Sequence, residues 1–205
     1  MSKIKFFFQQ SWLLLVSAFF FGLLLAITNA AWSPTIEQNK LMEANHLMAL
    51  LLPDAKTFQP ADQVDINLAR GKKGRSHIFK ALSADGQCVG WTFNAAGSGF
   101  ADKIEMIVAV DKNFQKIAGL DFISVNETPG FGDRIVLPYY RDQFTGAPAQ
   151  QLKLVKTGDD KKIDSEIVAI TGATVSSTAV INAVNAYTKQ VKDYLLMKGL
   201  ITDVK

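Results

Sequence analysis

The seven residues from Thr171 to Ser177 have the sequence Thr-Gly-Ala-Thr-Val-Ser-Ser and combine hydroxyl groups with small side chains. They lie between the apolar run 167–170 and residues that recur at helical spacing from Val180 to Leu195, so the pattern predicts a strand-to-helix turn. A helix start offers backbone N–H groups without intrahelical partners and the positive end of the helix dipole. We therefore expect this turn to suit a phosphate or another anion, with the Thr174 hydroxyl beside it.

The same composition also has an ordinary structural explanation. Serine, threonine and glycine are common at helix starts because a hydroxyl at the cap position accepts a hydrogen bond from an unpaired N–H. On composition alone, a plain capped helix is the commoner explanation of such a segment.

A second segment, Asn126–Asp133, follows a strand-like stretch from Ile117 to Val125. Its Pro129-Gly130 pair is a strong turn signal, because proline presets φ at the first central position and glycine supplies a positive φ at the second. By itself this pair predicts a surface turn more readily than a ligand loop.

Together, Asn126–Asp133 and Thr171–Thr174 resemble the flavin-binding domain of the G subunits of Rnf electron-transport complexes. The motif of that family is approximately Glu-Thr-Pro-Gly-Leu-Gly, followed further along the chain by Ser/Thr-Gly-Ala-Thr. The C subunits of sodium-pumping NADH:quinone reductases have a similar pair. The resemblance covers about Gly90 to Tyr187, together with the N-terminal membrane helix.

This resemblance implies a cofactor and a function. FMN would be attached to Thr174 by a phosphodiester bond that a separate flavin transferase makes. The chain would then be an electron-transfer subunit of a membrane-bound, ion-translocating ferredoxin:NAD oxidoreductase, with other membrane subunits that carry flavin and iron–sulfur centres as its partners. It would be a subunit of an enzyme with no catalytic residue of its own. The resemblance places the remaining site residues in two groups: Thr171, Gly172, Ala173, Val175 and Ser176 in the recognition turn, and Glu127, Thr128, Pro129 and Gly130 beside the flavin.

Small residues in the turn agree with that mapping. Gly172 has no Cβ and Ala173 has a minimal one, so a bulky flavin can pass close to the main chain. Two positions depart from the family pattern: Val168 stands where we expect an acidic residue, and Val125 stands where we expect a histidine. The first departure bears on recognition by a transferase and the second on the surroundings of the flavin.

The N-terminal end has the features of a membrane helix. No charged residue occurs between Phe6 and Ile36. This uncharged stretch is longer than the roughly 20 apolar residues that a helix needs to cross a bilayer. Lys3 and Lys5 precede this run, so the positive-inside rule places the N-terminus in the cytoplasm and the rest of the chain on the periplasmic or extracellular side. A signal peptide cleaved near Thr28-Asn29-Ala30 is the alternative.

Charge and composition exclude several classes of protein. The chain has 22 Lys plus Arg and 19 Asp plus Glu, which gives a formal net charge of +3 and no basic surface of the kind that binds nucleic acid. Its single cysteine, Cys88, can build neither an intramolecular disulfide nor a cysteine-rich metal site, and it is expected to be a buried thiol. Hydrolase, Walker and Rossmann fingerprints do not occur, and we expect no metal site.

The remaining pattern predicts an α+β fold, in which one N-terminal transmembrane helix precedes an exported antiparallel-sheet FMN-binding domain with segregated helices. Residues 1–31 form the cytoplasmic N-terminus and membrane helix, 32–75 a helical connector and loop, and 76–205 the FMN-binding domain. Segment 56–80 is expected to be irregular, with a basic solvated loop from Arg70 to Arg75. The predicted elements are a helix over 36–52, strands over 77–82, 88–94, 104–110, 117–125 and 152–155, and a closing helix over about 176–197.

Three other functions fit parts of the pattern. The chain is short for the C subunit of a sodium-translocating NADH:quinone reductase, although the motifs suit that protein too. A free-standing exported flavoprotein reductase would need a further catalytic domain, for which 205 residues leave little room. A non-redox, membrane-tethered assembly module would use residues 171–177 only as a capped helix start.

Overall fold

A computed structural model describes residues 3–68, 71 and 73–202 of the chain. By the density of its contacts the chain divides into two compact units, Met1–Glu43 and Ala44–Lys205. The first unit consists of most of the long helix α1 (Lys3–Leu51), and the second holds the end of α1 and all the other elements. The second unit has the α+β architecture that the sequence predicts.

Within α1, a long apolar stretch exposes its side chains. Large apolar residues such as Leu14, Phe19 and Leu25 are each more than 60% exposed. In the described part of the chain, the segment Gln10–Leu51 is the one helix that is long and apolar enough to cross a membrane. The sequence pattern predicts a separate helix over 36–52, whereas the structure has one continuous helix that contains Pro34.

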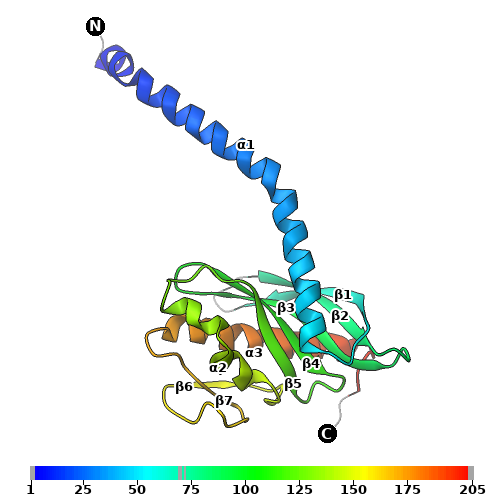
Figure 1. Cartoon of the computed structure of the whole chain (residues 1–205). Helices are drawn as coiled ribbons and strands as arrows, with labels where there is room; N and C mark the ends of the chain where they lie inside the picture. Colours follow the sequence, from blue (N-terminus) through cyan, green and yellow to red (C-terminus); the bar gives the residue numbers. More distant parts are fainter. Residues whose placement is uncertain (1–2, 69–70, 72, 203–205) are drawn as a thin grey trace. The chain divides into compact units, whose positions relative to one another are not determined.

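A five-stranded antiparallel sheet forms the centre of the second unit (Figure 1). Its strands lie in chain order, each paired with the next. They are β1 (Thr57–Asn67), β2 (Lys73–Leu82), β3 (Cys88–Ser98), β4 (Lys103–Asp111) and β5 (Ile117–Ser124).

Helix α3 (Thr174–Met197) covers one face of this sheet (Figure 1). Alternate residues of the central strands, such as Trp91, Phe93 and Val108, are buried in one apolar core with Val184 and Val191 of α3. The opposite face of the sheet packs against the last turns of α1. There the Thr92 hydroxyl lies 2.9 Å from the sulfur of Met48, and both residues are fully buried. The sheet is therefore a rigid base against which α3 is held.

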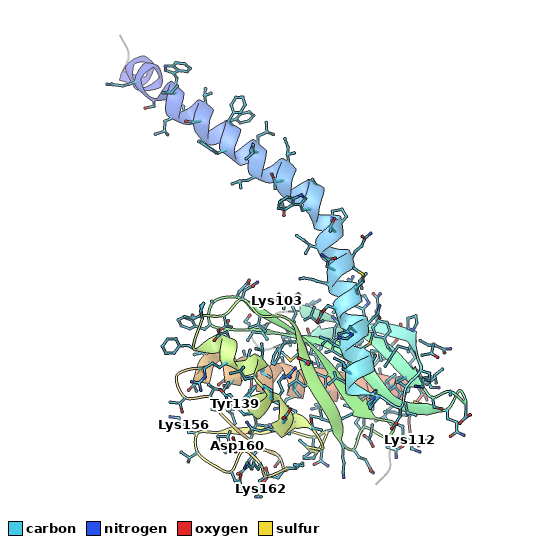
Figure 2. The ribbon with its side chains drawn as sticks, viewed as in Figure 1. Lys103, Lys112, Tyr139, Lys156, Asp160 and Lys162 are labelled. Atoms are coloured by element: carbon cyan, nitrogen blue, oxygen red, sulfur yellow. The ribbon has the colours of Figure 1, made fainter. Side chains whose placement is uncertain are left out.

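Shorter elements lie between β5 and α3. They are η2 (Gly132–Val136), α2 (Pro138–Arg141), η3 (Asp142–Phe144), and the parallel pair β6 (Lys153–Val155) and β7 (Glu166–Val168). The connection between β6 and β7 is charged, and its Lys156, Asp160 and Lys162 side chains are exposed and point outward (Figure 2). β7 leads into the turn before α3.

Residues 56–75 differ from the sequence-based expectation. The pattern predicts an irregular segment, but the structure forms β1 and the start of β2 there. β1 lies at the edge of the sheet and buries only Ile66 fully, so it lacks the alternating apolar pattern that identifies a strand. Within the predicted basic loop, Arg70 and Lys72 lie outside the described residues, while Lys73 and Arg75 belong to β2.

Candidate functional site

The turn before α3 leaves its helix start uncapped by any side chain. Ala173 is the cap residue, and the first backbone bond of the helix runs from the N–H of Ser177 to the Ala173 carbonyl at 2.9 Å. Among the described residues, the N–H groups of Thr174, Val175 and Ser176 have no hydrogen-bond partner. The hydroxyl-capped start that composition alone predicts is therefore wrong, and these three amides remain without a partner at the helix end that favours anions.

The hydroxyl groups of the turn have different surroundings. Ser176 and Ser177 are buried and hydrogen-bonded: Ser176 donates to a carboxylate, and the Ser177 oxygen accepts the N–H of Ile170 at 3.2 Å. The Thr178 hydroxyl donates to the Thr174 carbonyl at 2.6 Å. Thr174 itself is exposed, and its hydroxyl has no internal partner among the described residues. The Thr174 hydroxyl is thus unbonded and lies at the start of α3 beside the unpaired amides; Thr171, which is exposed too, has no side-chain hydrogen bond among the described residues either.

Gly172 and Phe131 bring the two motif segments into contact. Gly172 has a φ of +82°, which L side chains rarely adopt, and a Cβ built on it would lie 3.2 Å from Cδ1 of Phe131. Phe131 is 56% exposed and belongs to the loop that contains Thr128, Pro129 and Gly130. The loop and the turn therefore lie in contact at this point.

Two buried polar residues, Gln143 and Tyr140, bond to the backbone just before the turn and within it. Gln143, only 4% exposed, accepts the N–H of Val168 at 2.7 Å and donates to the carbonyls of Val168 and Tyr139. The Tyr140 hydroxyl donates to the Ser177 carbonyl at 3.3 Å, and burial raises the pKa of Tyr140 so that it stays a donor. Sequence reasoning missed both residues, because their partners lie 25 and 37 positions away.

Glu127 lies against the turn with its carboxylate turned inward. It is 7% exposed and accepts four hydrogen bonds, three of them from backbone N–H groups of the turn between β3 and β4. Ser176 of α3 donates the fourth, at 2.6 Å. Burial alone would raise the pKa of the Glu127 carboxyl, but the four hydrogen bonds outweigh it and the pKa is lowered. Glu127 therefore stays ionised, and its oxygens are occupied by the protein itself.

Three large apolar side chains are exposed around these groups. Phe100 is 72% exposed, Phe131 56% and Val175 53%. Phe100 and Ser176 bond to the same oxygen of Glu127, and Phe131 covers Gly172. We call Phe100, Phe131 and Val175 the apolar rim. An aromatic ring carried by Thr174 would find apolar contacts there.

A cavity of about 1000 Å³ extends from the turn along α3, between this helix, the end of β3 and residues 149–151. It begins at Thr174 and Val175 and ends near Asp193, and none of residues 126–133 lines it. Most of its wall is small or polar, and the lining includes Ala96, Gly97, Ser98, Ala149, Gln150, Thr178, Ala179, Asn182, Ala183 and Ala186. A phosphate at the unpaired amides of the turn would have room for the rest of a nucleotide-sized group in this cavity.

The two departures from the family pattern occupy structural positions. Val168 is half-buried on β7, and a Cβ on Gly158 would lie 3.2 Å from its Cγ2. Val125 is half-buried and packs against the main core. Cys88 is also half-buried, and burial raises the pKa of its thiol. None of these three residues lines the cavity along α3.

Comparison with known proteins identifies the same region. Residues 99–189 match the model of the FMN-binding domain family. This range includes the loop, the turn and most of α3.

Relatives align over most of the chain. The G subunit of the proton-translocating ferredoxin:NAD(+) oxidoreductase complex of Clostridium ljungdahlii is 30% identical over 88% of this chain and 89% of its own length. The G subunit of the Na(+)-translocating ferredoxin:NAD(+) oxidoreductase complex of Acetobacterium woodii is 30% identical over 78% and 80%. The G subunit of the ion-translocating oxidoreductase complex of Methanosarcina acetivorans is 29% identical over 80% and 82%.

Solved structures share the fold. NqrC of Shewanella oneidensis superimposes with a TM-score of 0.54 and 23% identity, over 69% of this chain and 73% of that one. The C subunit of the Na(+)-translocating NADH-quinone reductase of Parabacteroides distasonis gives 0.50 and 23%, over 65% and 77%.

Proposed function

Because the chain belongs to the family of G subunits of ion-translocating oxidoreductase complexes, we propose that it is an electron-transfer subunit of such a complex and carries FMN covalently on Thr174. The relatives are named for complexes that use ferredoxin and NAD(+), and we extend that reaction to this chain. Its partners would be the other membrane subunits of the complex.

One observation carries the attachment site: an exposed threonine hydroxyl stands at a helix start whose first three amides are unpaired among the described residues. A phosphodiester on Thr174 would place its charged oxygens near the N–H groups of Thr174, Val175 and Ser176, where the helix dipole favours negative charge. The flavin supplies the redox chemistry when bound. The chain contributes the anchor, the open amides and the apolar rim.

Attachment also implies a maturation partner and an orientation. A separate flavin transferase would form the bond, as the family resemblance implies, while the Glu127 carboxylate is occupied by four hydrogen bonds from the protein. The apolar helix would anchor the chain in the inner membrane. With Lys3 and Lys5 at its start, the N-terminus would be cytoplasmic and the flavin domain periplasmic or extracellular.

The test compares Thr174→Ala with Thr178→Ala, a threonine one turn later on α3 whose hydroxyl bonds to a backbone carbonyl. Each full chain is co-expressed with a flavin transferase, denatured, and measured by intact mass and by in-gel flavin fluorescence. We expect the FMN adduct in the wild type and in Thr178→Ala, and none in Thr174→Ala.

Three results would contradict parts of the proposal. Covalent flavin in Thr174→Ala would move the attachment to another residue. An unmodified wild type, with a transferase that modifies a control protein, would favour the non-redox assembly module. Reduction of the isolated flavoprotein by a soluble hydride donor, followed by turnover of a small substrate, would favour a free-standing reductase.

A further inference from the structure

Glu127 connects three segments of the chain next to the attachment turn. We propose that Glu127 is a positioning residue of the flavin site, which fixes the start of α3 and supplies a permanent negative charge beside the group carried by Thr174. This inference rests on the proposed function, and it concerns a residue whose carboxylate oxygens bond to groups of the protein itself. Glu127 belongs to the loop, its Ser176 partner to the first turn of α3, and its three N–H donors to the turn between β3 and β4.

The chain is shaped around this carboxylate. A Cβ on Gly99 would lie 2.1 Å from Oε1 of Glu127, and a Cβ on Gly132 would lie 2.6 Å from Oε2 and 2.7 Å from Oγ of Ser176. Neither glycine has a positive φ, so close approach rather than backbone conformation requires the missing side chain. A side chain at either position would displace the carboxylate from its donors. The two glycines therefore leave the space that the Glu127 carboxylate occupies, and the position of Ser176 depends on its bond to that carboxylate.

No cation within the described part of the chain neutralises the charge. Among these residues, no lysine, arginine or histidine forms an ion pair with Glu127, and its partners are N–H groups and one hydroxyl. These bonds also keep the pKa of the carboxyl below its ordinary value, so the charge persists at neutral pH. A buried charge acts over a longer range than a solvated one, because the surrounding medium screens it less. Adding an electron near it is correspondingly less favourable.

Glu127→Gln separates the charge from the bulk of the side chain. The amide nitrogen of the introduced side chain is best placed next to Ser176, because the Ser176 hydroxyl can rotate to accept a hydrogen bond. In this orientation the N–H of Phe100 has no acceptor. The full chain, loaded with FMN by a transferase, is titrated for the midpoint potential of the flavin and measured for flavin fluorescence anisotropy. We expect a higher potential, about tenfold in the equilibrium constant of one-electron reduction or about 59 mV, and a lower anisotropy.

Three further variants distinguish charge from position. Glu166→Gln removes an exposed carboxylate on β7 and should change neither quantity. Ser176→Ala keeps the Glu127 charge and removes one bond, so the anisotropy should fall while the potential stays close to that of the wild type. Glu127→Asp keeps the charge on a shorter side chain, so its potential should lie nearer to that of the wild type than to that of Glu127→Gln.

The proposal fails if loaded Glu127→Gln has the potential and the anisotropy of the wild type, even when its thermal midpoint falls, because the residue is then only structural. If Glu127→Gln takes up no flavin, the positioning role is tested by amide hydrogen exchange, measured on the flavin-free wild type and the flavin-free variant. Faster exchange at Phe100, Ala101, Asp102 and Ser177 than in the wild type supports that role, and unchanged exchange overturns it. A wild type without FMN contradicts the proposed function instead, and the same exchange experiment still decides whether Glu127 fixes the start of α3.

Discussion

The two motif segments place their polar side chains in opposite ways. In the loop, Glu127 is buried and accepts four hydrogen bonds from the protein. In the turn, Thr174 is exposed, and neither its hydroxyl nor its N–H has an internal partner among the described residues. The two segments therefore combine a residue that connects parts of the chain with a residue whose hydroxyl is unbonded among the described residues, and their chemical types alone do not tell which is which.

The largest expected difference between the two segments is in stability. Glu127→Ala removes the acceptor of three part-buried bonds from N–H groups and of one buried bond from a hydroxyl, and we expect a loss of about 3 kcal/mol in the free energy of unfolding. Thr174→Ala removes an exposed, unbonded hydroxyl and should change it by less than about 0.5 kcal/mol. Denaturant unfolding followed by tryptophan fluorescence measures both. Similar losses of unfolding free energy in the two variants would mean that Glu127 is no more important for stability than Thr174.

A pair of glycines sharpens the comparison at the contact between the segments. Gly172 and Gly130 both have positive φ, +82° and +77°, so alanine at either costs about 1–2 kcal/mol of backbone strain. Only at Gly172 does the new Cβ meet a neighbour, Phe131 at 3.2 Å; around Gly130 there is nothing within 4 Å. We expect chemical denaturation to show the larger loss of unfolding free energy for Gly172→Ala. Equal losses would mean that Phe131 moves aside freely.

Gln143 tests whether the strand before the turn belongs to the scaffold. Gln143→Ala leaves the part-buried N–H of Val168 without an acceptor, and we expect a loss of about 1 kcal/mol in the free energy of unfolding by chemical denaturation. Gln190→Ala is the control, because its side chain makes similar backbone bonds to Asn67 in an exposed place. An equally large loss of unfolding free energy for Gln190→Ala would show that the exposure of these side-chain-to-backbone bonds does not determine how much stability their removal costs.

The smallest effect is a pH dependence. The pKa of Glu127 is lower in the folded chain than its ordinary value of 4.5, so the unfolded chain binds the proton more readily. The stability that this difference supplies is fully present above the unfolded pKa and is lost as the pH falls through the folded one. Unfolding of Glu127→Gln between about pH 6 and about pH 3 should therefore be less pH-dependent than that of the wild type. An identical change of unfolding free energy with pH in the two proteins would mean that other carboxyl groups determine the pH dependence.

Much of the fold could be predicted from the sequence. The closing helix is predicted over about 176–197 and observed over Thr174–Met197, and the central strands begin within a few residues of their predicted starts. Apolar periodicity marks these elements because each buries one face. β1 carries no such signal, since an edge strand with Pro60 beside a register shift and a single fully buried residue has a polar sequence.

The site was predictable only in part. Local spacing predicts the turn and the helix start, because these depend on neighbours in the chain, whereas the attachment role of Thr174 comes from the family resemblance and stays a prediction. The partners of Glu127 lie 25 to 27 and 49 positions away, and no local pattern reports them. The one available signal was glycine at positions 99 and 132, where close approach excludes a side chain.

The bond from Ser176 to Glu127 also has a consequence for how the cofactor is retained. A helix start carries about half an elementary positive charge, and the first turn of α3 already bonds to one full negative charge. A nucleotide phosphate that joins it is a second anion at the same helix end, so dissociable FMN should bind weakly here despite the open amides. The covalent ester that we propose on Thr174 would make occupancy independent of that affinity.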